Sequence, residues 1–102
     1  MKAKTGIELI AQERQEQIEK HGRTVERDYA ENPELQLLQG AHELLHIYPS
    51  ELRFPKNWDK AIVHRMISKS IRDRLIIAGA LIAAQLDVME YDMMSEINSN
   101  QG

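Results

Sequence analysis

The feature that most constrains the fold is an apolar pattern between residues 71 and 93. Apolar residues recur there at 71, 75, 78, 82, 86, 89 and 93, in steps of three or four that define one stripe along a helix. From residue 75 to 84 the chain reads LIIAGALIAA, so the opposite side is apolar as well. A helix that is apolar all round is buried all round. We therefore expect a central helix or a subunit interface. The run is shorter than the roughly 20 apolar residues that cross a bilayer, so we expect no membrane span.

Capping signals predict two further helices. Thr5 followed by Glu8 forms a capping box that starts a helix ending at His21, before Gly22. Asn32 as the N-cap and Pro33 at the first helical position predict a second helix, with Glu34 in its first turn and its end before Pro49.

The remaining segments complete the predicted layout. Residues 23–32 read as a charged connection, and residues 49–57 as a loop with two prolines. A short helix is expected at Trp58–Met66, and the long helix is expected to begin at Ser68 or Ser70. No segment alternates with period two, so no sheet is expected. The prediction is an all-α fold, a small helical bundle of three main helices plus a short one. One domain spans residues 1–95, and a flexible polar tail spans residues 96–102.

Composition excludes several functional classes. The formal net charge is −3, and five residues are aromatic, which argues against binding a nucleic-acid polymer. The chain has no cysteine, so it has no disulfide and no thiol nucleophile. The first residues, MKAKTGIELIAQER, lack the apolar segment of a signal peptide, and we expect a cytoplasmic location. There is no G-x-S-x-G sequence and no Gly-rich phosphate loop.

Three charged residues fall on apolar helix faces. Arg14 lies near the centre of the face defined by Ile7, Ile10, Ala11 and Ile18, with Gln17 beside it. Glu34 falls on the apolar stripe of the second helix, and Asp87 on the second apolar face of the long helix. Burying a lone charge costs several kcal/mol. The three side chains either meet each other, as in a buried Arg14–Glu34 ion pair, or line a cavity that holds a metal or a charged ligand.

A purely structural interpretation stands beside these two. Glu34 is favoured by the helix dipole in a first turn and can be solvated there. Arg14 can lay its methylenes on the core with its head in water. Asp87 can lie where the long helix has emerged from the core.

The histidines form a weaker motif. His42, Glu43 and His46 match H-E-x-x-H, the zinc-protease pattern. That motif needs a third ligand and a substrate cleft, and Pro49 follows almost at once. Exposed or half-buried helix histidines are the better interpretation.

Two blocks of the sequence resemble a known family. The first is Ile10-Ala11-Gln12-Glu13-Arg14-Gln15-Glu16-Gln17-Ile18, and the second is Ala78-Gly79-Ala80-Leu81-Ile82. Between them lie matching positions at Gly22, Asp28, Glu34-Leu35, Trp58 and Lys69. Over about residues 7–88 the chain resembles MazG-like phage and prophage proteins related to the N-terminal domain of dATP/dGTP diphosphohydrolases.

The resemblance implies an all-α nucleotide pyrophosphohydrolase that uses Mg²⁺ and releases pyrophosphate from purine (d)NTPs. Carboxylates suit Mg²⁺ because it prefers oxygen ligands. The implied metal ligands are Glu13, Glu34 and Asp87, of which Glu13 and Glu34 also serve as catalytic residues. The implied substrate-binding residues are Arg14, Gln17 and Lys69. A homo-oligomer is expected through the helix at 70–93.

The long helix departs from the family pattern. Relatives usually have an acid at the position of Arg74, a lysine at Ile77 and a glutamate at Gln85, while Asp87 keeps an acid. Glu31 and Glu34 have the spacing of an E-x-x-E motif, but Asn32-Pro33 begins a predicted helix between them. The alternative function is a catalytically inactive helical module that binds a nucleotide or a protein partner.

Overall fold

The computed structural model describes the backbone of residues 3–101 and the side chains of residues 3–94. Every regular element in this range is helical, which confirms the predicted all-α class. The elements are α1 (Gly6–His21), α2 (Val25–Glu31), α3 (Gln36–Leu44), the 3-10 helix η1 (Glu51–Arg53), α4 (Lys60–Ile67) and α5 (Ile71–Gln101).

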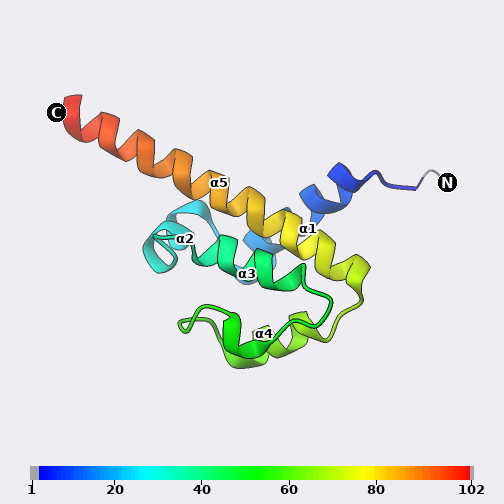
Figure 1. Ribbon diagram of the computed structural model, residues 1–102. Helices are drawn as coiled ribbons and strands as arrows, with labels where there is room; N and C mark the ends of the chain where they lie inside the picture. The colour runs from blue at the N-terminus through cyan, green and yellow to red at the C-terminus, as the bar shows by residue number, and fades with distance from the viewer. Residues whose placement is uncertain (1–2, 102) are drawn as a thin grey trace.

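Helix α5 is the central element, as its apolar pattern predicts. It runs the length of the molecule, and α1, α2 and α3 all pack against it (Figure 1). The core consists mainly of apolar side chains from α3 and α5: Leu37, Ala41, Leu44, Ile77, Ala78, Leu81, Ala84 and Val88. None of the helices in the described residues is long and apolar enough to cross a membrane.

Helix α1 begins and ends where its caps predict. The Thr5 hydroxyl accepts the Glu8 N–H, and the Glu8 carboxylate accepts the Thr5 N–H, which completes the capping box. Gly22 ends the helix at φ 65°, a left-handed conformation that glycine adopts at little cost. The predicted range Thr5–His21 is therefore confirmed.

The predicted connection at residues 23–32 is wrong, because Val25–Glu31 forms α2. The Thr24 hydroxyl caps its first turn by accepting the Arg27 N–H. Asn32 ends this helix, and its side-chain oxygen accepts the Trp58 indole N–H at 2.9 Å. Asn32 is thus engaged by α2 and Trp58, and it does not start the next helix.

The predicted start of the second helix at Asn32-Pro33 is wrong for the same reason, whereas its predicted end before Pro49 is confirmed. Helix α3 begins at Gln36 and ends at Leu44, well before Pro49. Leu35, at its N-cap position, provides no side-chain cap. The missing cap comes from α5, as described below.

The predicted short helix is confirmed as α4, with Asp59 as its N-cap. Helix α5 starts at Ile71, and the Ser70 hydroxyl accepts the Asp73 N–H. The helix continues to Gln101, so it includes most of the segment predicted as a polar tail. The flexibility of that tail stays a prediction.

Glycines permit two close helix contacts. A Cβ on Gly79 would lie 2.5 Å from the Ile10 side chain, and one on Gly40 would lie 2.3 Å from the Trp58 ring. Both distances are too short for a real contact. The absence of a side chain at Gly79 therefore allows α1 to pack closely on α5, and its absence at Gly40 allows Trp58 to pack on α3.

Candidate functional site

The Arg14 side chain is buried, with 8% of the residue exposed. Its Nη1 donates to the Arg23 carbonyl at 3.0 Å. Its Nη2 lies 3.3 Å from Asp87 Oδ2 and 3.9 Å from Asp28 Oδ2. Arg14 therefore links α1 to α2 and α5. Its carboxylate partners are Asp28 and Asp87 rather than Glu34.

Asp28 is the most enclosed member of this network, with 1% of the residue exposed. Arg23 Nη2 lies 3.1 Å from its Oδ1. Neither carboxylate oxygen has a hydrogen bond of good geometry, and neither has Arg14 Nε. Burial raises the pKa of Asp28, and the nearby charges of Arg23 and Arg14 oppose that rise. The two carboxylates of the network face two guanidinium groups, so Arg14 is engaged within the fold. Its predicted role in binding phosphate stays a prediction.

Three predicted site residues, Glu13, Gln17 and Lys69, lie near one another. Glu13 on α1 is half-buried and accepts a bond from the Gln17 amide at 3.5 Å. Burial raises the pKa of Glu13, and the charge of Glu16 adds to that rise. The Gln17 bond and the positive charge of Lys69 act in the opposite direction. Glu13 and Lys69 are thus close enough for their charges to interact.

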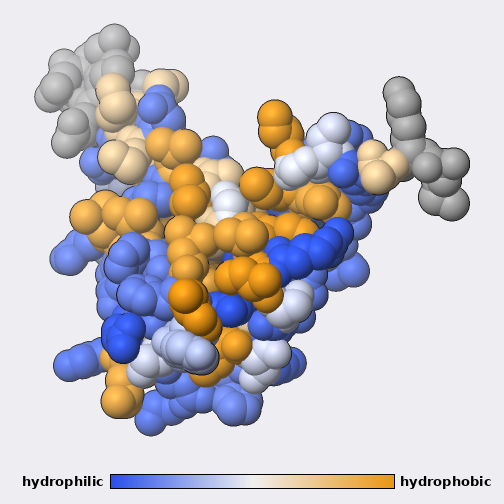
Figure 2. Space-filling view, turned by 45° about the vertical axis from the view of Figure 1, so that its right-hand side comes forward, coloured by the Kyte–Doolittle hydropathy of each residue, from blue (hydrophilic) through white to orange (hydrophobic). Residues whose placement is uncertain are grey.

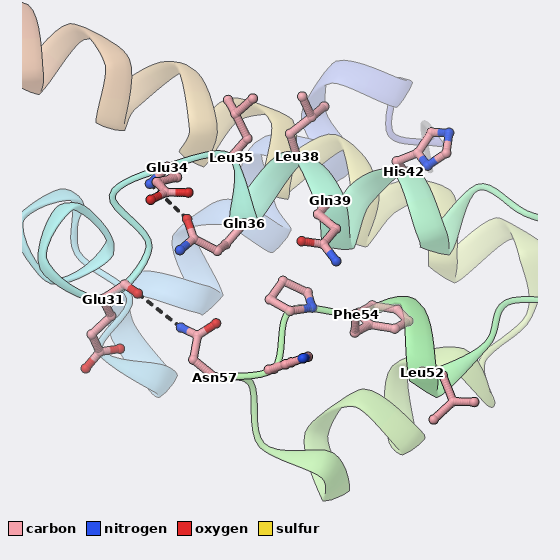
Figure 3. Close-up of a pocket in the computed structure, with 12 residues that line it drawn as sticks. Glu31, Glu34, Leu35, Gln36, Leu38, Gln39, His42, Leu52, Phe54 and Asn57 are labelled. Atoms are coloured by element: carbon pink, nitrogen blue, oxygen red, sulfur yellow. Dashed lines mark hydrogen bonds between the residues drawn. The ribbon is translucent and has the colours of Figure 1, made fainter.

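A pocket lies elsewhere, between α3 and the segment that contains η1 (Figure 3). Its volume is about 910 Å³, within the range of 300–1,000 Å³ typical of small-molecule sites. The lining residues are Glu31, Glu34, Leu35, Gln36, Leu38, Gln39, His42, Leu52, Phe54, Pro55, Lys56 and Asn57. Of the predicted site residues, Glu34 alone is among them.

Glu31 and Glu34 both line this pocket although they do not share a helix. Glu31 is the last residue of α2, and Glu34 lies in the turn before α3. The turn is held by the Gln36 side chain, which accepts the Glu34 N–H at 2.8 Å, and by Asn57, which donates to the Glu31 carbonyl at 3.0 Å (Figure 3). The Glu31 carboxylate pairs with Arg27 at the surface. The E-x-x-E spacing thus places both acids on the pocket wall.

The pocket offers three kinds of contact. The acids among the lining residues are Glu31 and Glu34, and the positive charge is Lys56. Amides extend from Gln36 and Gln39 on α3, and Asn57 faces them from the opposite side (Figure 3). Leucines, Phe54 and Pro55 supply apolar surface. An apolar lining with a few polar groups is typical of a ligand site.

Two buried polar residues of α5 close the ends of α3. Gln85 accepts the Leu38 N–H at 3.1 Å and donates to the Glu34 carbonyl at 3.3 Å. Arg74 donates to the carbonyls of Leu44 and His46 at 3.1 and 2.6 Å. The two positions where the resembled family usually has acids therefore hold the termini of α3 in this chain.

The H-E-x-x-H motif serves the fold. Glu43 is buried and accepts the Ser50 N–H at 2.8 Å, while Arg53 lies 3.3 Å from the same oxygen. The rings of His42 and His46 stack edge to face at 5.0 Å. Glu43 thus fixes the loop after α3, a role that its place in the motif does not reveal.

The structure does not gather the predicted metal ligands into one cluster. Among side chains at residues 3–94, no three of His, Asp or Glu are grouped to hold a metal ion. Glu34 lines the pocket, Asp87 contacts Arg14, and Glu13 contacts Gln17. The Mg²⁺ site built from Glu13, Glu34 and Asp87 stays a prediction.

Comparisons with known proteins do not assign a family. No protein-family model, no curated protein and no solved structure matches this chain. The resemblance to MazG-like proteins therefore rests on the sequence motifs, and the helical architecture is compatible with it.

Proposed function

We propose that this protein binds a purine nucleoside triphosphate in the α3 pocket and hydrolyses it to the monophosphate and pyrophosphate. The observation that carries the proposal is that Glu31 and Glu34 both line a pocket of about 910 Å³. Lys56, in the segment that also carries Asn57, lines the pocket as well and supplies a cation for phosphate. The apolar and amide groups of the lining suit a base and its polar edge.

The donor set fits Mg²⁺ as nucleotide enzymes use it. Mg²⁺ is usually held by one or two carboxylates together with substrate phosphates, and it keeps several waters. Glu34 would supply one such carboxylate, and Glu31 would supply a second on release from Arg27, so a third protein ligand is not required. When bound, the ion would offset the charge of the phosphates.

A residue of the pocket can take the proton that the attacking water loses during hydrolysis. A water attacks the α-phosphorus, the bond from that phosphorus to the bridging oxygen breaks, and pyrophosphate leaves. Glu34 is exposed at the pocket, where its carboxylate can take the proton that the water loses.

A coupled assay tests this proposal. Pyrophosphate release is followed for each (d)NTP with Mg²⁺, using inorganic pyrophosphatase and phosphate detection. Glu34→Gln should abolish release while keeping the fold. Glu26→Gln is the matched control, because Glu26 is an exposed acid of α2 outside the pocket lining. Release that is unchanged in Glu34→Gln would refute the assignment.

The second candidate is a non-catalytic nucleotide-binding module. Arg74 and Gln85 favour this candidate. They stand at positions where the resembled family usually has acids, and here they form hydrogen bonds to the ends of α3 instead. Thermal melting with dATP and Mg²⁺ separates the candidates. A ligand at 100 times its Kd stabilises the folded state by about 2.7 kcal/mol. Stabilisation without pyrophosphate release supports the module, and no stabilisation by any nucleotide contradicts both candidates.

A further inference from the structure

The most exposed large apolar side chains of the described residues gather in one short stretch. At residues 3–94, the four with the greatest exposure are Leu52 (94%), Tyr48 (86%), Ile7 (83%) and Ile47 (78%). Three of these four lie between residues 47 and 52, while Ile7 lies on α1. Removing apolar area from water is the main favourable term in association. Residues 47–52 are therefore a candidate contact surface.

This stretch belongs to the segment that joins α3 to α5. We call residues 45–70 the α3–α5 connection, which contains η1 and α4. Helix α4 packs mainly on η1, whereas α1, α2 and α3 pack on α5. Figure 1 shows α4 at the lower edge of the molecule. In Figure 2 that edge is mainly hydrophilic, with single apolar side chains between the polar ones. The connection is thus accessible to an outside surface.

The α3–α5 connection is basic although the chain is acidic. It carries five basic and two acidic side chains, a net charge of +3, whereas the whole chain has a net charge of −3. One acid, Glu51, pairs with His64 at 2.6 Å, and Asp59 accepts the Ile62 N–H at the start of α4. The basic side chains are Arg53, Lys56, Lys60, Arg65 and Lys69. Positive charge therefore dominates this edge.

Contacts within the connection bring its cations beside the exposed apolar side chains. The pair between His64 and Glu51 joins α4 to η1, and Leu52 follows Glu51 in the chain. Lys60 lies four residues before His64, so both side chains share the face of α4 that is directed toward η1. Lys56 lines the same pocket as Leu52. Leu52 therefore lies close to several positive charges.

Ile47 and Tyr48 are held near Leu52 by the loop before η1. The buried Glu43 carboxylate accepts the Ser50 N–H at 2.8 Å and lies 3.3 Å from Arg53. The loop and η1 are thus fixed to the same oxygen of α3. Four residue steps separate Tyr48 from Leu52, which limits their Cα separation to about 14 Å. The apolar side chains therefore form one small surface.

We propose that this edge docks on the anionic surface of a lipid bilayer, with Ile47, Tyr48 and Leu52 entering the interfacial layer. Tyrosine is favoured at the membrane–water interface, and aliphatic side chains gain by leaving water there. Lysine and arginine near the surface are attracted by anionic headgroups. The docking is a property of the α3–α5 connection and does not depend on nucleotide hydrolysis.

Two features favour a bilayer over a protein partner. The three apolar side chains are almost fully exposed, and lipids can surround a projecting side chain, whereas a protein partner needs a surface of matching shape. Three of the five basic residues are lysines, a residue type that is depleted at protein–protein interfaces. A lipid surface attracts a lysine by its charge alone and needs no bidentate geometry.

The acids of the chain do not oppose this docking. The two nearest the connection, Glu43 and Asp73, pair with Arg53 and Arg72. The acids in the second half of α5 begin at Asp87, about 24 Å along the helix axis from its first residue at 1.5 Å per residue. Exposed charges are largely screened beyond about 8 Å at physiological salt. The bilayer therefore interacts mainly with the cations of the connection.

Vesicle flotation tests the role of charge. The full chain should float with vesicles of phosphatidylcholine and phosphatidylserine at low salt, and it should not float with phosphatidylcholine alone. Lys60→Glu should weaken the binding about tenfold, because it replaces attraction with repulsion at the surface. Lys20→Glu is the matched control, since Lys20 is exposed on α1, and its binding should equal that of the wild type. Failure to float with anionic vesicles would overturn the proposal, as would equal flotation with neutral ones.

A site-specific fluorescent label tests insertion, and the chain has no native cysteine to compete for it. An environment-sensitive dye on Leu52→Cys should shift its emission to shorter wavelength when anionic vesicles are added, because residue 52 leaves water. The same dye on Ile7→Cys is the control, since Ile7 is similarly exposed but lies on α1, and its emission should not shift. A shift at residue 7 without one at residue 52 would refute the assignment of this edge.

Sedimentation equilibrium separates a membrane surface from a protein interface. The double variant Ile47→Ser with Tyr48→Ser should lose flotation with anionic vesicles, because it removes two of the inserting side chains. Its sedimentation mass and helical circular dichroism should equal those of the wild type, since both residues are exposed in the single chain. A variant that lowers the mass of an assembly and still floats would show that residues 47–52 bind protein, and the membrane proposal would fail.

Discussion

Replacing Arg14 with methionine tests how the buried charges hold three helices together. Methionine keeps an apolar stem of similar length, so the change removes mainly the guanidinium. Asp87 is 53% exposed at its side chain and can regain water, but Asp28 is 1% exposed and cannot. Losing one partner of a buried pair costs about 3–5 kcal/mol. Arg23 remains 3.1 Å from Asp28, so we expect the lower end, about 3 kcal/mol.

Urea denaturation followed by circular dichroism measures this loss. A domain of this length has a free energy of unfolding of roughly 5–15 kcal/mol, so the midpoint should fall markedly. Arg27→Met is the matched control, since the Arg27–Glu31 pair is about half exposed and should cost under about 1 kcal/mol. Adding Asp28→Asn to Arg14→Met should recover part of the loss, because it removes the uncompensated charge. Additive losses in the double variant would refute the coupling between Arg14 and Asp28.

The free energy of unfolding of the same variants should change with pH in a defined direction. Burial raises the pKa of Asp28 in the folded state above its ordinary value of 3.8, so the folded state binds the proton more readily than the unfolded state. The contribution of Asp28 to the stability of the folded state therefore becomes less favourable as pH rises from 3.8 through the folded pKa. Removing Arg14 takes away a charge that lowers this pKa. Arg14→Met should therefore increase the loss of stability that accompanies a rise in pH. Asp28→Asn should abolish the contribution, and an identical slope in all variants would contradict the assignment.

Three further predictions concern packing, capping and charge. Gly40→Ala should lower the free energy of unfolding by about 1–3 kcal/mol, because its Cβ would meet the Trp58 ring at 2.3 Å; thermal melting measures the change, and no loss would show that the ring can shift. Gln85→Leu should cost about 1–3 kcal/mol in urea denaturation, because it leaves polar groups at the start of α3 without partners; a neutral effect would mean that water replaces the cap. Lys69→Met should raise the pKa of Glu13 further, because it removes an opposing positive charge; carboxyl NMR titration measures it, and a lowered pKa would contradict the proximity of the two groups.

The strongly periodic and well-capped helices could be predicted from the sequence. The capping box and Gly22 determine α1, and the uninterrupted apolar pattern determines α5. The start of α3 could not be predicted, because Asn32 carries a strong N-cap signal that its contacts with α2 and Trp58 override. The actual cap, Gln85, lies 47 residues from Leu38 in the chain. No local pattern reports so distant a partner.

The candidate site was predictable only in part. The burial of Arg14 follows from its position among apolar residues, and its contact with Asp87 agrees with one of the two outcomes expected for charges on apolar faces. Asp28 was not predicted as the enclosed partner, because residues 23–32 lacked an expected helix. The spacing of Glu31 and Glu34 was visible in the sequence, but the sequence did not show whether the two side chains share a face. Their common place in the pocket lining depends on the turn that Gln36 and Asn57 stabilise.

The capping of α3 by α5 has a consequence for folding during synthesis. A nine-residue helix such as α3 is not stable alone in water, and here both of its ends are satisfied by residues 74 and 85. Helices α1 and α2 pack on the same late segment. The first 70 residues thus lack the surface on which they must assemble. We therefore expect these helices to assemble only after α5 has been synthesised, and we expect truncation within α5 to leave them open to proteolysis.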